Sequence, residues 1–292
     1  MSAAVAECGI ALLASRIRFE EKRILAAFDR RGVPVHQVDA RELRFALHAG
    51  EPLWRLVLNR EISATRARYA AVSLESAGTL VLNSATTTEV CGDKWDTSLA
   101  LRRAGVPTPR TVIALTPQAA LAELADLGYP AVIKPLAGSW GKRVSLVREP
   151  DAARAVLEHC EALPSPQHHL IYLQEYVDKP DRDIRVVVVG GQPVAASYRV
   201  ADDWRCNVAL GADSQPCPLT PELAKLATAA ARAVDADLAG VDLVEDRAGA
   251  LMVLEVNHNV EFAGAQRAHG NRVDVAERIV DHVLGRYQAA AR

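Results

Sequence analysis

Short apolar runs and amphipathic stretches alternate along the first third of the chain. Ile10–Ala14 has the apolar character of a buried strand, and Phe19–Arg30 keeps its apolar side chains on one helical face. Further strands are predicted at Val35–Val38, Trp54–Asn59 and Thr79–Leu82, with a helix from about Thr65. This alternation predicts a small parallel α/β sheet.

The middle of the chain continues the mixed pattern. A single helix is predicted from about Thr87 to Ala104, because Gly105-Val106-Pro107 then ends it. The elements predicted after it are strand Thr111–Ala114, helix Pro117–Leu127, strands Ala131–Lys134 and Val144–Val147, and helix Ala152–Cys160.

The last third is richer in strands. The predicted elements are strands Ile171–Tyr176, Ile184–Val189 and Val194–Tyr198, helix Pro221–Val234, strands Leu238–Glu245 and Ala250–Asn257, and helix Val273–Ala290. We therefore predict a mixed α/β (α+β) protein, parallel at its start and strand-rich towards its end.

Composition and charge exclude several classes of protein. The 292 residues are 50% hydrophobic and 24% charged, an ordinary globular mixture with room for two or three subdomains. A formal net charge of −2 gives no polybasic segment for nucleic acid or a membrane surface. No apolar stretch approaches the ~18–20 residues that span a bilayer. Glu7 interrupts the apolar N-terminus, which also lacks a leading positive charge, so we predict a strand there rather than a signal peptide.

The five cysteines form no C-x-x-C pair and no metal-type spacing. We interpret them as reduced packing residues of a soluble, cytoplasmic protein.

The final predicted hairpin carries three oxygen-bearing side chains. Glu255 and Asn257 are two residues apart and face the same way on a strand. If residue 245 pairs with 250, residue 242 pairs with 253, and Asp242 joins them on one face. Two carboxylates and an amide oxygen suit Mg²⁺ that also contacts phosphates. The alternative is a solvated polar face, although the intervening residues are apolar.

A lysine at the end of a predicted strand precedes a loop that contains two glycines. Lys134 can neutralise a phosphate, and Gly138 and Gly141 let backbone N–H groups approach its oxygens. The spacing fits neither a Walker loop nor G-x-G-x-x-G. An ordinary turn remains the alternative.

A third polar segment consists of Gln174-Glu175-Tyr176-Val177, followed by Asp183. It offers hydrogen bonds to an adenine edge and a ribose. By spacing alone, a salt-bridged surface strand explains it equally well.

In this order, the three segments resemble the ATP-grasp fold with an N-terminal parallel α/β pre-ATP-grasp domain. The chain is similar nearly end to end to the ligases that act on a small amino-group carrier protein in lysine and arginine biosynthesis, which are related to the ribosomal protein S6 glutamate ligases. The motifs that carry the resemblance are Arg16-Ile17-Arg18, Cys91-Gly92-Asp93-Lys94-Trp95, Lys134-Pro135, Gly138-Ser139-Trp140-Gly141, Gln174–Val177, Lys179-Pro180, Arg182–Val186, Cys217-Pro218-Leu219-Thr220, Val241-Asp242-Leu243, Glu255-Val256-Asn257-His258 and Glu261-Phe262.

The resemblance implies a role for each motif residue. Lys94 and Lys134 are expected to bind ATP phosphates under a closing loop. The residues of that loop are Gly138, Ser139, Trp140 and Gly141. Adenine is expected beside Gln174, Glu175 and Val177, and the ribose at Asp183. Mg²⁺ is expected at Asp242, Glu255 and Asn257. The residues expected near the transferred phosphate and the substrate are Arg199, Arg205 and Asn207.

The same resemblance implies three domains and a reaction. We expect a pre-ATP-grasp domain over 1–88, a central subdomain with the phosphate loop over 89–172, and a C-terminal subdomain with the metal hairpin over 173–292. The implied enzyme is an ATP- and Mg²⁺-dependent ligase. It activates the C-terminal glutamate side chain of a small acidic carrier protein as an acyl phosphate and joins it to the amine of an amino acid. By resemblance the protein is a homo-oligomer, a dimer or a tetramer.

The sequence departs from the family at one place. The family reads Asn-x-x-Arg-Gly-Gly where this chain has Asn207-Val208-Ala209-Leu210-Gly211-Ala212. The loss of a positive charge at Leu210 and of a glycine at Ala212 leaves the acceptor open. The acceptor can be α-aminoadipate, glutamate or a related amino acid. Two alternatives to the carrier ligase also remain, a ligase for a free small-molecule carboxylate and a nucleotide-binding module without catalysis.

Overall fold

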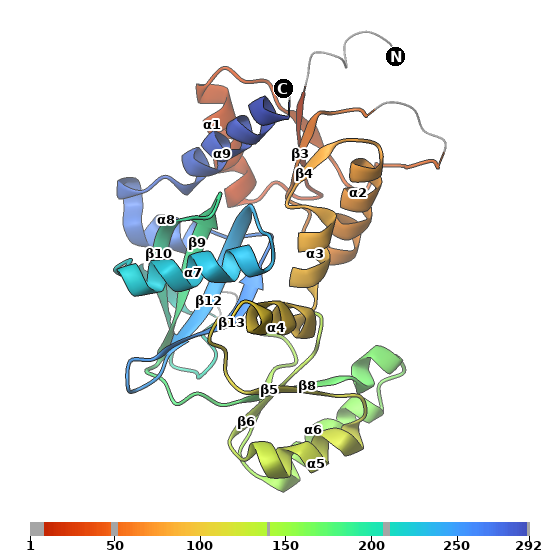
Figure 1. Ribbon diagram of the computed structural model, residues 1–292, viewed down its shortest axis with the longest axis vertical. Helices are drawn as coiled ribbons and strands as arrows, with labels where there is room; N and C mark the ends of the chain where they lie inside the picture. The colour runs from red at the N-terminus through yellow and green to blue at the C-terminus, as the bar shows by residue number, and fades with distance from the viewer. Residues whose placement is uncertain (1–8, 48–51, 139–140, 207–210, 291–292) are drawn as a thin grey trace.

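The computed structural model describes residues 9–47, 52–138, 141–206 and 211–290, whose strands form three sheets (Figure 1). The first sheet has the order β2-β1-β3-β4, and its strands all run parallel. Its elements are β1 (Ile10–Leu13), α1 (Phe19–Arg30), β2 (His36–Val38), β3 (Leu56–Asn59), α2 (Ala64–Ser76) and β4 (Leu80–Leu82). The predicted parallel α/β sheet is confirmed.

Both faces of this sheet are buried, because neighbouring residues of each strand enter different cores. Ile10 and Leu12 of β1 pack with α1 and with α9 (Val275–Ala289). Ala11 and Leu13 pack with α2 on the other face. Helices on both sides explain why these strands are uniformly apolar rather than alternating.

The second sheet, β5-β8-β6-β7, is antiparallel, and α5 and α6 cover one of its faces at the lower end of the molecule (Figure 1). Its elements are β5 (Thr111–Ala114), α5 (Pro117–Leu127), β6 (Ala131–Lys134), β7 (Ser145–Val147), α6 (Pro150–Glu161) and β8 (Ile171–Glu175). Leu124 and Leu157 join the two helices to Ile133 and Leu173 of the sheet. The opposite face carries Val132, Lys134 and Gln174.

The third sheet is antiparallel, with the order β11-β10-β9-β12-β13. Its elements are β9 (Arg182–Val189), β10 (Gln192–Val200), β11 (Asp213–Pro216), α7 (Pro221–Ala233), β12 (Leu238–Glu245), β13 (Leu251–Asn257) and α8 (Ala263–His269). Val186 and Val188 of β9 pack on α7, whereas Val187 and Val189 pack with α9 and the first sheet. The first and third sheets therefore share a core.

The helix expected over 87–104 is two helices, α3 (Ala85–Gly92) and α4 (Lys94–Arg103). Asp93 has extended backbone angles (φ −123°, ψ 126°), and its side chain accepts hydrogen bonds from the backbone N–H groups of Trp95 and Asp96. An aspartate that satisfies the first N–H groups of a new helix is a typical N-cap. The uninterrupted helical pattern concealed this cap, so the prediction of one helix was wrong.

The predicted register of the β12–β13 hairpin was also wrong. Glu245 pairs with Leu251 and Leu243 with Val253, but Asp242 pairs with Glu255, because a bulge interrupts the ladder there. One extra residue on β13 shifts the remaining pairs by one position. The bulge leaves Asp242 directly opposite Glu255, so the two carboxylates still lie together.

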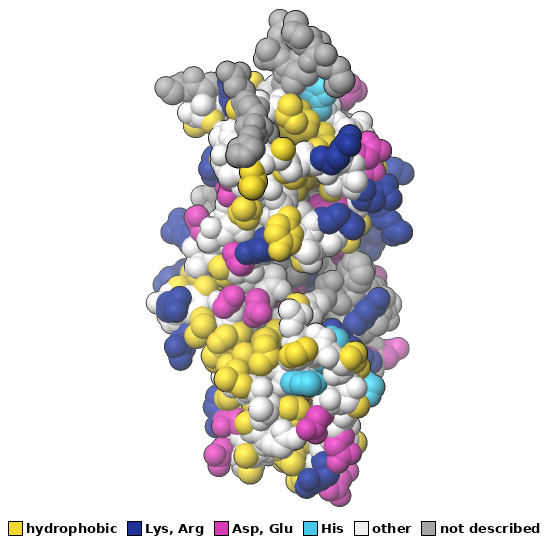
Figure 2. Space-filling model, turned by 90° about the vertical axis from the view of Figure 1, so that its right-hand side faces the viewer, with side chains coloured by type: hydrophobic (Ala, Val, Ile, Leu, Met, Phe, Trp, Pro, Cys, Tyr) yellow, Lys and Arg dark blue, Asp and Glu magenta, His cyan; other side chains and the backbone are white. Residues whose placement is uncertain are grey.

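Within the described residues, four elements were not predicted: β11, α8 and two short 3₁₀ helices at Pro166–His169 and Gly270–Arg272. Each is short and lacks a clear apolar period, so tertiary contacts determine it. Within the described ranges, no helix combines the length and apolar character needed to cross a bilayer. Basic and acidic side chains are interspersed over the face drawn in Figure 2.

Candidate active site

A cavity of about 440 Å³ lies where the second and third sheets meet residues of the first. Its lining includes most of the side chains that the sequence singled out. These are Lys94, Lys134, Gly138, Gly141, Gln174, Glu175, Val177, Asp183, Arg199, Arg205, Asp242, Glu255 and Asn257. Ser139, Trp140 and Asn207, like Leu210, lie outside the described residues.

The two predicted phosphate lysines come from different elements and enter the same cavity. Lys94 is the first residue of α4, and its Nζ lies 2.9 Å from the carbonyl oxygen of Gly138 and 3.4 Å from Oε1 of Glu255. Lys134 ends β6, and its Nζ donates to Oε1 of Gln174 at 2.6 Å. The break at Asp93 places Lys94 at a helix start, where it faces the loop after Lys134.

Burial changes the proton affinity of Lys134. It lowers the pKa of Lys134 to about 8, while Glu255 opposes the shift and Lys94 adds to it. The amine is therefore mostly charged at pH 7, and an anionic ligand would favour the charged form further. A desolvated lysine in a cavity is suited to bind a phosphate group.

Asp242, Glu255 and Asn257 form one oxygen-rich group at the end of the hairpin. Asp242 faces Glu255 across the ladder, and Nδ2 of Asn257 lies 3.3 Å from Oδ2 of Asp242. Because Nδ2 is the donor in that contact, Oδ1 of Asn257 is the atom that can bind a cation. Among the described residues no group of three His, Cys, Asp or Glu side chains forms a metal site, and here the third ligand type is an amide.

Two arginines hold Asp242 in its charged form. Arg185 donates to both carboxylate oxygens, and Nη2 of Arg199 lies 3.0 Å from Oδ1. Burial opposes ionisation, but Arg185 and Arg199 outweigh it and lower the pKa of Asp242. An ionised carboxylate beside a second carboxylate and an amide oxygen fits a hard divalent cation such as Mg²⁺.

Arg199 links Asp242 of the expected metal site to Asp183, the residue expected to bind the ribose. Its Nε donates to Oδ1 of Asp183 at 2.6 Å, and both side chains are nearly fully buried. Burial raises the pKa of Asp183 despite Arg199. Burial would lower the pKa of Arg199, but Asp242 and Asp183 raise it, so the arginine stays charged.

The predicted adenine segment lines the same cavity and contacts Lys134 through Gln174. Oε1 of Glu175 accepts from the backbone N–H of Arg110 at 2.7 Å, and Nε2 of Gln174 donates to Thr111 and Tyr172. The side chains of both residues are thus held by the protein, and Glu175 and Val177 line the cavity. The rings of Tyr176 and Trp204 pack edge to face, with 6.4 Å between their centroids.

Several lining residues were not predicted. Arg185 could have been found, because it lies two positions after Asp183 on a strand and shares its face. Trp204, Glu61 and Asn259 carried no local pattern of a site, whereas His258 stands in the motif Glu255-Val256-Asn257-His258 that carries the family resemblance. Burial and nearby Arg60 lower the pKa of His258 to about 4, so its ring is neutral at pH 7. Cys91 also lines the cavity, but burial raises the pKa of its thiol to about 12, which makes it a poor nucleophile.

Two family models together match most of the chain. The RimK-like ATP-grasp domain matches residues 91–283, and the LysX preATP-grasp domain matches residues 10–90.

Relatives and solved structures with similar sequences or folds are ligases or ATP-grasp proteins. "Glutamate--LysW ligase ArgX" of Sulfolobus acidocaldarius is 31% identical and covers 95% of this chain and 99% of its own. "Alpha-aminoadipate--LysW ligase LysX" of Saccharolobus solfataricus is 33% identical over 88% of this chain and 94% of its own. The crystal structure of a RimK domain ATP-grasp protein from Sphaerobacter thermophilus has a TM-score of 0.79 and 29% identity, and covers 94% of this chain and 99% of its own.

Proposed function

Because this chain belongs to the RimK-like ATP-grasp family, we propose that it joins the C-terminal glutamate side chain of a small acidic carrier protein to the amine of an amino acid. The chain is an ATP-grasp ligase that uses ATP and Mg²⁺. Relatives that match almost its full length are named as LysW ligases, which supports a carrier protein as the partner.

One observation carries the proposal. Nζ of Lys94 lies 3.4 Å from Oε1 of Glu255. A lysine expected to bind phosphate and a carboxylate expected to bind the metal ion therefore lie side by side in one cavity. The two residues come from α4 and β13 and are 161 positions apart in sequence. A cation-binding oxygen group beside two lysines is what a polyphosphate with its divalent cation requires.

Each residue group has a proposed task. Lys94 and Lys134 bind the phosphates of ATP, and the loop that contains Gly138 and Gly141 covers them. Glu175 and Val177 contact adenine, with Gln174 holding Lys134 in place. Asp183 is proposed for the ribose. Asp242, Glu255 and Asn257 would hold Mg²⁺, which when bound neutralises phosphate charge.

The reaction needs no nucleophile from the protein. The substrate carboxylate attacks the γ-phosphorus of ATP, the bond to ADP breaks, and an acyl phosphate forms. The amine then attacks the acyl carbon, and inorganic phosphate leaves. Four cationic side chains are proposed to stabilise the negative charge that develops, namely those of Arg199, Arg205 and the two lysines. They act as hydrogen-bond donors held in position by the protein. Asn207, which lies outside the described residues, is proposed to act with them.

We also propose a division of the chain into domains 1–88, 89–172 and 173–292, a cytoplasmic location, and a dimer or tetramer. Light scattering on the purified protein measures the oligomer directly, and a monomer at micromolar concentration would contradict that part.

The proposal is tested by trapping the activated carboxylate. The protein is incubated with ATP, Mg²⁺, hydroxylamine and a small acidic carrier protein that ends in glutamate. We expect ADP and a hydroxamate on the carrier, and neither with a carrier that lacks its last residue. Hydroxamate on a free carboxylate instead would support the small-molecule ligase. ATP binding without any ADP release would contradict catalysis.

A further inference from the structure

Behind the cavity lining, a chain of side-chain hydrogen bonds runs between the two lysines that are expected to bind phosphate. Ser98 of α4 donates to the carbonyl oxygen of Lys94 at 2.8 Å and lies 2.8 Å from the hydroxyl oxygen of Tyr172. Nε2 of Gln174 lies 3.2 Å from the same hydroxyl, and its Oε1 accepts from Lys134 at 2.6 Å. Neither Ser98 nor Tyr172 lines the cavity, so their effect on a ligand there has to pass through the other three residues.

The strand pairing brings most of these side chains to one face of the second sheet. Lys134 of β6 pairs with Tyr172 of β8 across the antiparallel ladder. Gln174 lies two positions further along β8 and therefore shares the face of Tyr172. Thr111 of β5 pairs with Gln174 on its other side. Tyr172 and Gln174 are 1% and 2% exposed, so the hydrogen bond between them forms away from solvent.

The direction of each hydrogen bond is determined, because the chain ends on backbone carbonyl groups, which only accept. Ser98 gives its one hydroxyl proton to the carbonyl of Lys94, so the hydroxyl of Tyr172 has to be the donor towards Ser98. Burial raises the pKa of Tyr172, so the phenol keeps the proton that it donates. The oxygen of Tyr172 then accepts from Gln174.

Thr111 determines the orientation of the Gln174 amide from the other side. The hydroxyl of Thr111 donates to the carbonyl oxygen of Pro109 at 2.8 Å, so its oxygen accepts from Nε2 of Gln174, which lies 3.0 Å away. Two acceptors, Thr111 and Tyr172, therefore hold the amide NH₂ group, and Oε1 is turned towards Lys134. A flipped amide would place N–H groups against the ammonium group and break all three hydrogen bonds of the side chain.

This chain joins two parts of the protein that have separate hydrophobic cores. Leu101 of α4 packs in the core of the third sheet and α7, whereas Ile133 and Leu173 pack with α5 and α6. The elements that carry Lys94 and Lys134 therefore belong to different cores. A lysine has a flexible four-carbon stem, so its ammonium group is held in place only by fixed partners. The oriented amide of Gln174 is such a partner for Lys134.

We propose that Tyr172, held by Ser98, is a positioning residue that acts through Gln174 to fix the ammonium group of Lys134 relative to Lys94, so that both lysines contact one polyphosphate. The inference rests on the proposed function, since it assumes that both lysines bind the phosphates of ATP. It adds to that function two residues, Tyr172 and Ser98, that lie outside the cavity lining and influence nucleotide affinity.

A double-mutant cycle tests the positioning role. Tyr172→Phe removes the hydroxyl and keeps the ring, whose centroid lies 5.9 Å from Nζ of Lys134. We expect the affinity for a non-hydrolysable ATP analogue with Mg²⁺ to fall about 2- to 10-fold, the value of one net hydrogen bond. In the Lys134→Ala background the same substitution should have almost no effect, because the hydroxyl acts through the lysine.

The cycle also defines the contradicting results. An equal loss of affinity in both backgrounds would show a purely structural role for the hydroxyl, and no loss in either would show no role. Each of these outcomes would overturn the inference. Tyr69→Phe is the matched control, because it makes the same chemical change at a position of α2 that is 62% exposed, and it should leave the affinity unchanged.

The pH dependence of nucleotide affinity provides a readout that a loss of stability does not move. The affinity should fall as pH rises through the pKa of Lys134, about 8. Gln174→Glu places a carboxylate beside the amine, favours its charged form and should raise the midpoint by about 1 pH unit. Tyr172→Phe leaves the amide acceptor less well held and should lower the midpoint. Any other order of the three midpoints would contradict the inference.

The same titrations separate this inference from the proposed function. Wild-type nucleotide affinity in Lys134→Ala would contradict the phosphate role of that lysine, and with it both proposals. Weakened binding in Lys134→Ala together with unchanged binding in Tyr172→Phe would overturn the positioning role alone. Because the titrations need no turnover, an absence of hydroxamate in the trapping experiment would count only against the ligase reaction.

Discussion

Lys134 and Glu255 line the same cavity from different sheets. The contribution of each to ligand binding can be measured by replacing that side chain alone. The lysine ends β6 and the glutamate lies near the end of β13. Their charges interact, since Glu255 opposes the lowering of the lysine pKa. Replacing either residue should therefore weaken the binding of ATP or Mg²⁺ rather than destabilise the fold.

Lys134→Ala should weaken ATP binding about 10- to 100-fold, the value of one charge-assisted hydrogen bond. The wild-type affinity should also fall as pH rises from 7 to 9. The phosphates favour the charged amine, which is lost as pH passes the pKa of about 8. Fluorescence titration with a nucleotide across this pH range measures both. The fall should be smaller in Lys134→Ala, and exposed Lys225→Ala is the control.

Glu255→Gln and Asp242→Asn should both raise the Mg²⁺ concentration needed for activity, but only the second should lower stability substantially. Glu255 has 29% of its side chain exposed. Asp242 is 6% exposed and pairs with Arg185 and Arg199. Removing one partner of such a buried group costs about 3–5 kcal/mol. Mg²⁺ titration of ADP release and thermal unfolding separate the effects. Equal melting temperatures would contradict the pairing.

At the scale of elements, the break between α3 and α4 positions the site. Asp93 caps α4, and the backbone N–H of Lys94 donates to the carbonyl oxygen of Leu136 at 3.0 Å, which ties the helix start to the loop after β6. A continuous helix would direct Lys94 elsewhere. The bulge in β13 has a comparable effect, since it brings Glu255 opposite Asp242.

Asp93→Ala should therefore cost about 1 kcal/mol of stability through loss of the cap. It should also weaken nucleotide binding, because Lys94 is the next residue. Asp93→Asn keeps an oxygen acceptor and should have a smaller effect on both quantities. Chemical denaturation and nucleotide titration of the two variants provide the comparison. Full nucleotide affinity in Asp93→Ala would show that the cap does not position Lys94.

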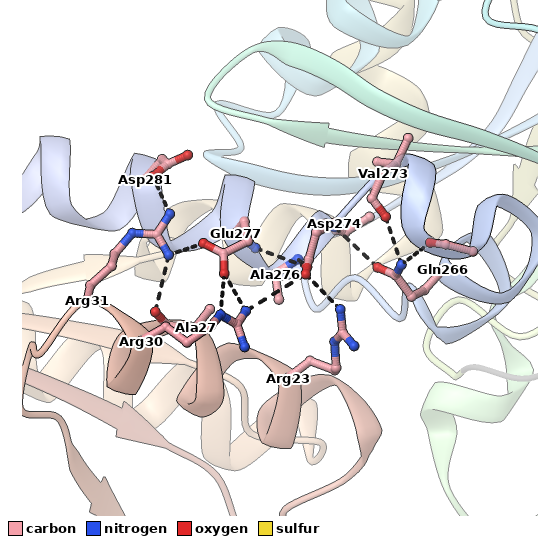
Figure 3. A network of polar contacts seen from close by, with 12 residues as sticks. Arg23, Ala27, Arg30, Arg31, Gln266, Val273, Asp274, Ala276, Glu277 and Asp281 are labelled. Carbon is pink, nitrogen blue, oxygen red and sulfur yellow. Dashed lines mark hydrogen bonds and ion pairs between the residues drawn. The ribbon is translucent and has the colours of Figure 1, made fainter.

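At the scale of the whole molecule, the two ends of the chain are joined. Helix α1 lies along α9, and Arg23, Arg30 and Arg31 pair with Asp274, Glu277 and Asp281 (Figure 3). The same helices share a buried core with the first and third sheets. Arg18 and Glu261 both line the cavity and come from the two parts of the chain that this contact joins, so the contact helps to hold them in position.

Glu277→Gln removes the partner shared by Arg30 and Arg31. Because these side chains are partly exposed, we expect a loss of at most about 1 kcal/mol at low salt, smaller at 1 M salt where charges are screened. Thermal unfolding at the two salt concentrations measures it. A loss that does not depend on salt would indicate that packing rather than charge joins the helices.

The amino-acid sequence by itself predicted most of the elements and, from residue type, the candidate nucleotide and metal residues. The period of apolar positions fixed strands such as Ala131–Lys134 and helices such as Phe19–Arg30 with their observed bounds, because burial of one face is a local property. The residue types of Lys134, Asp242 and Glu255 indicated phosphate and metal binding.

Only the tertiary structure decided which side chains meet. The cap at Asp93 and the hairpin bulge depend on contacts that no periodicity encodes. The cavity combines Arg18 and Glu61 with Asn259 and Glu261, from opposite ends of the chain. Their proximity cannot be read from their local segments, because only chain folding brings them to one cavity, where solvent screens charges less.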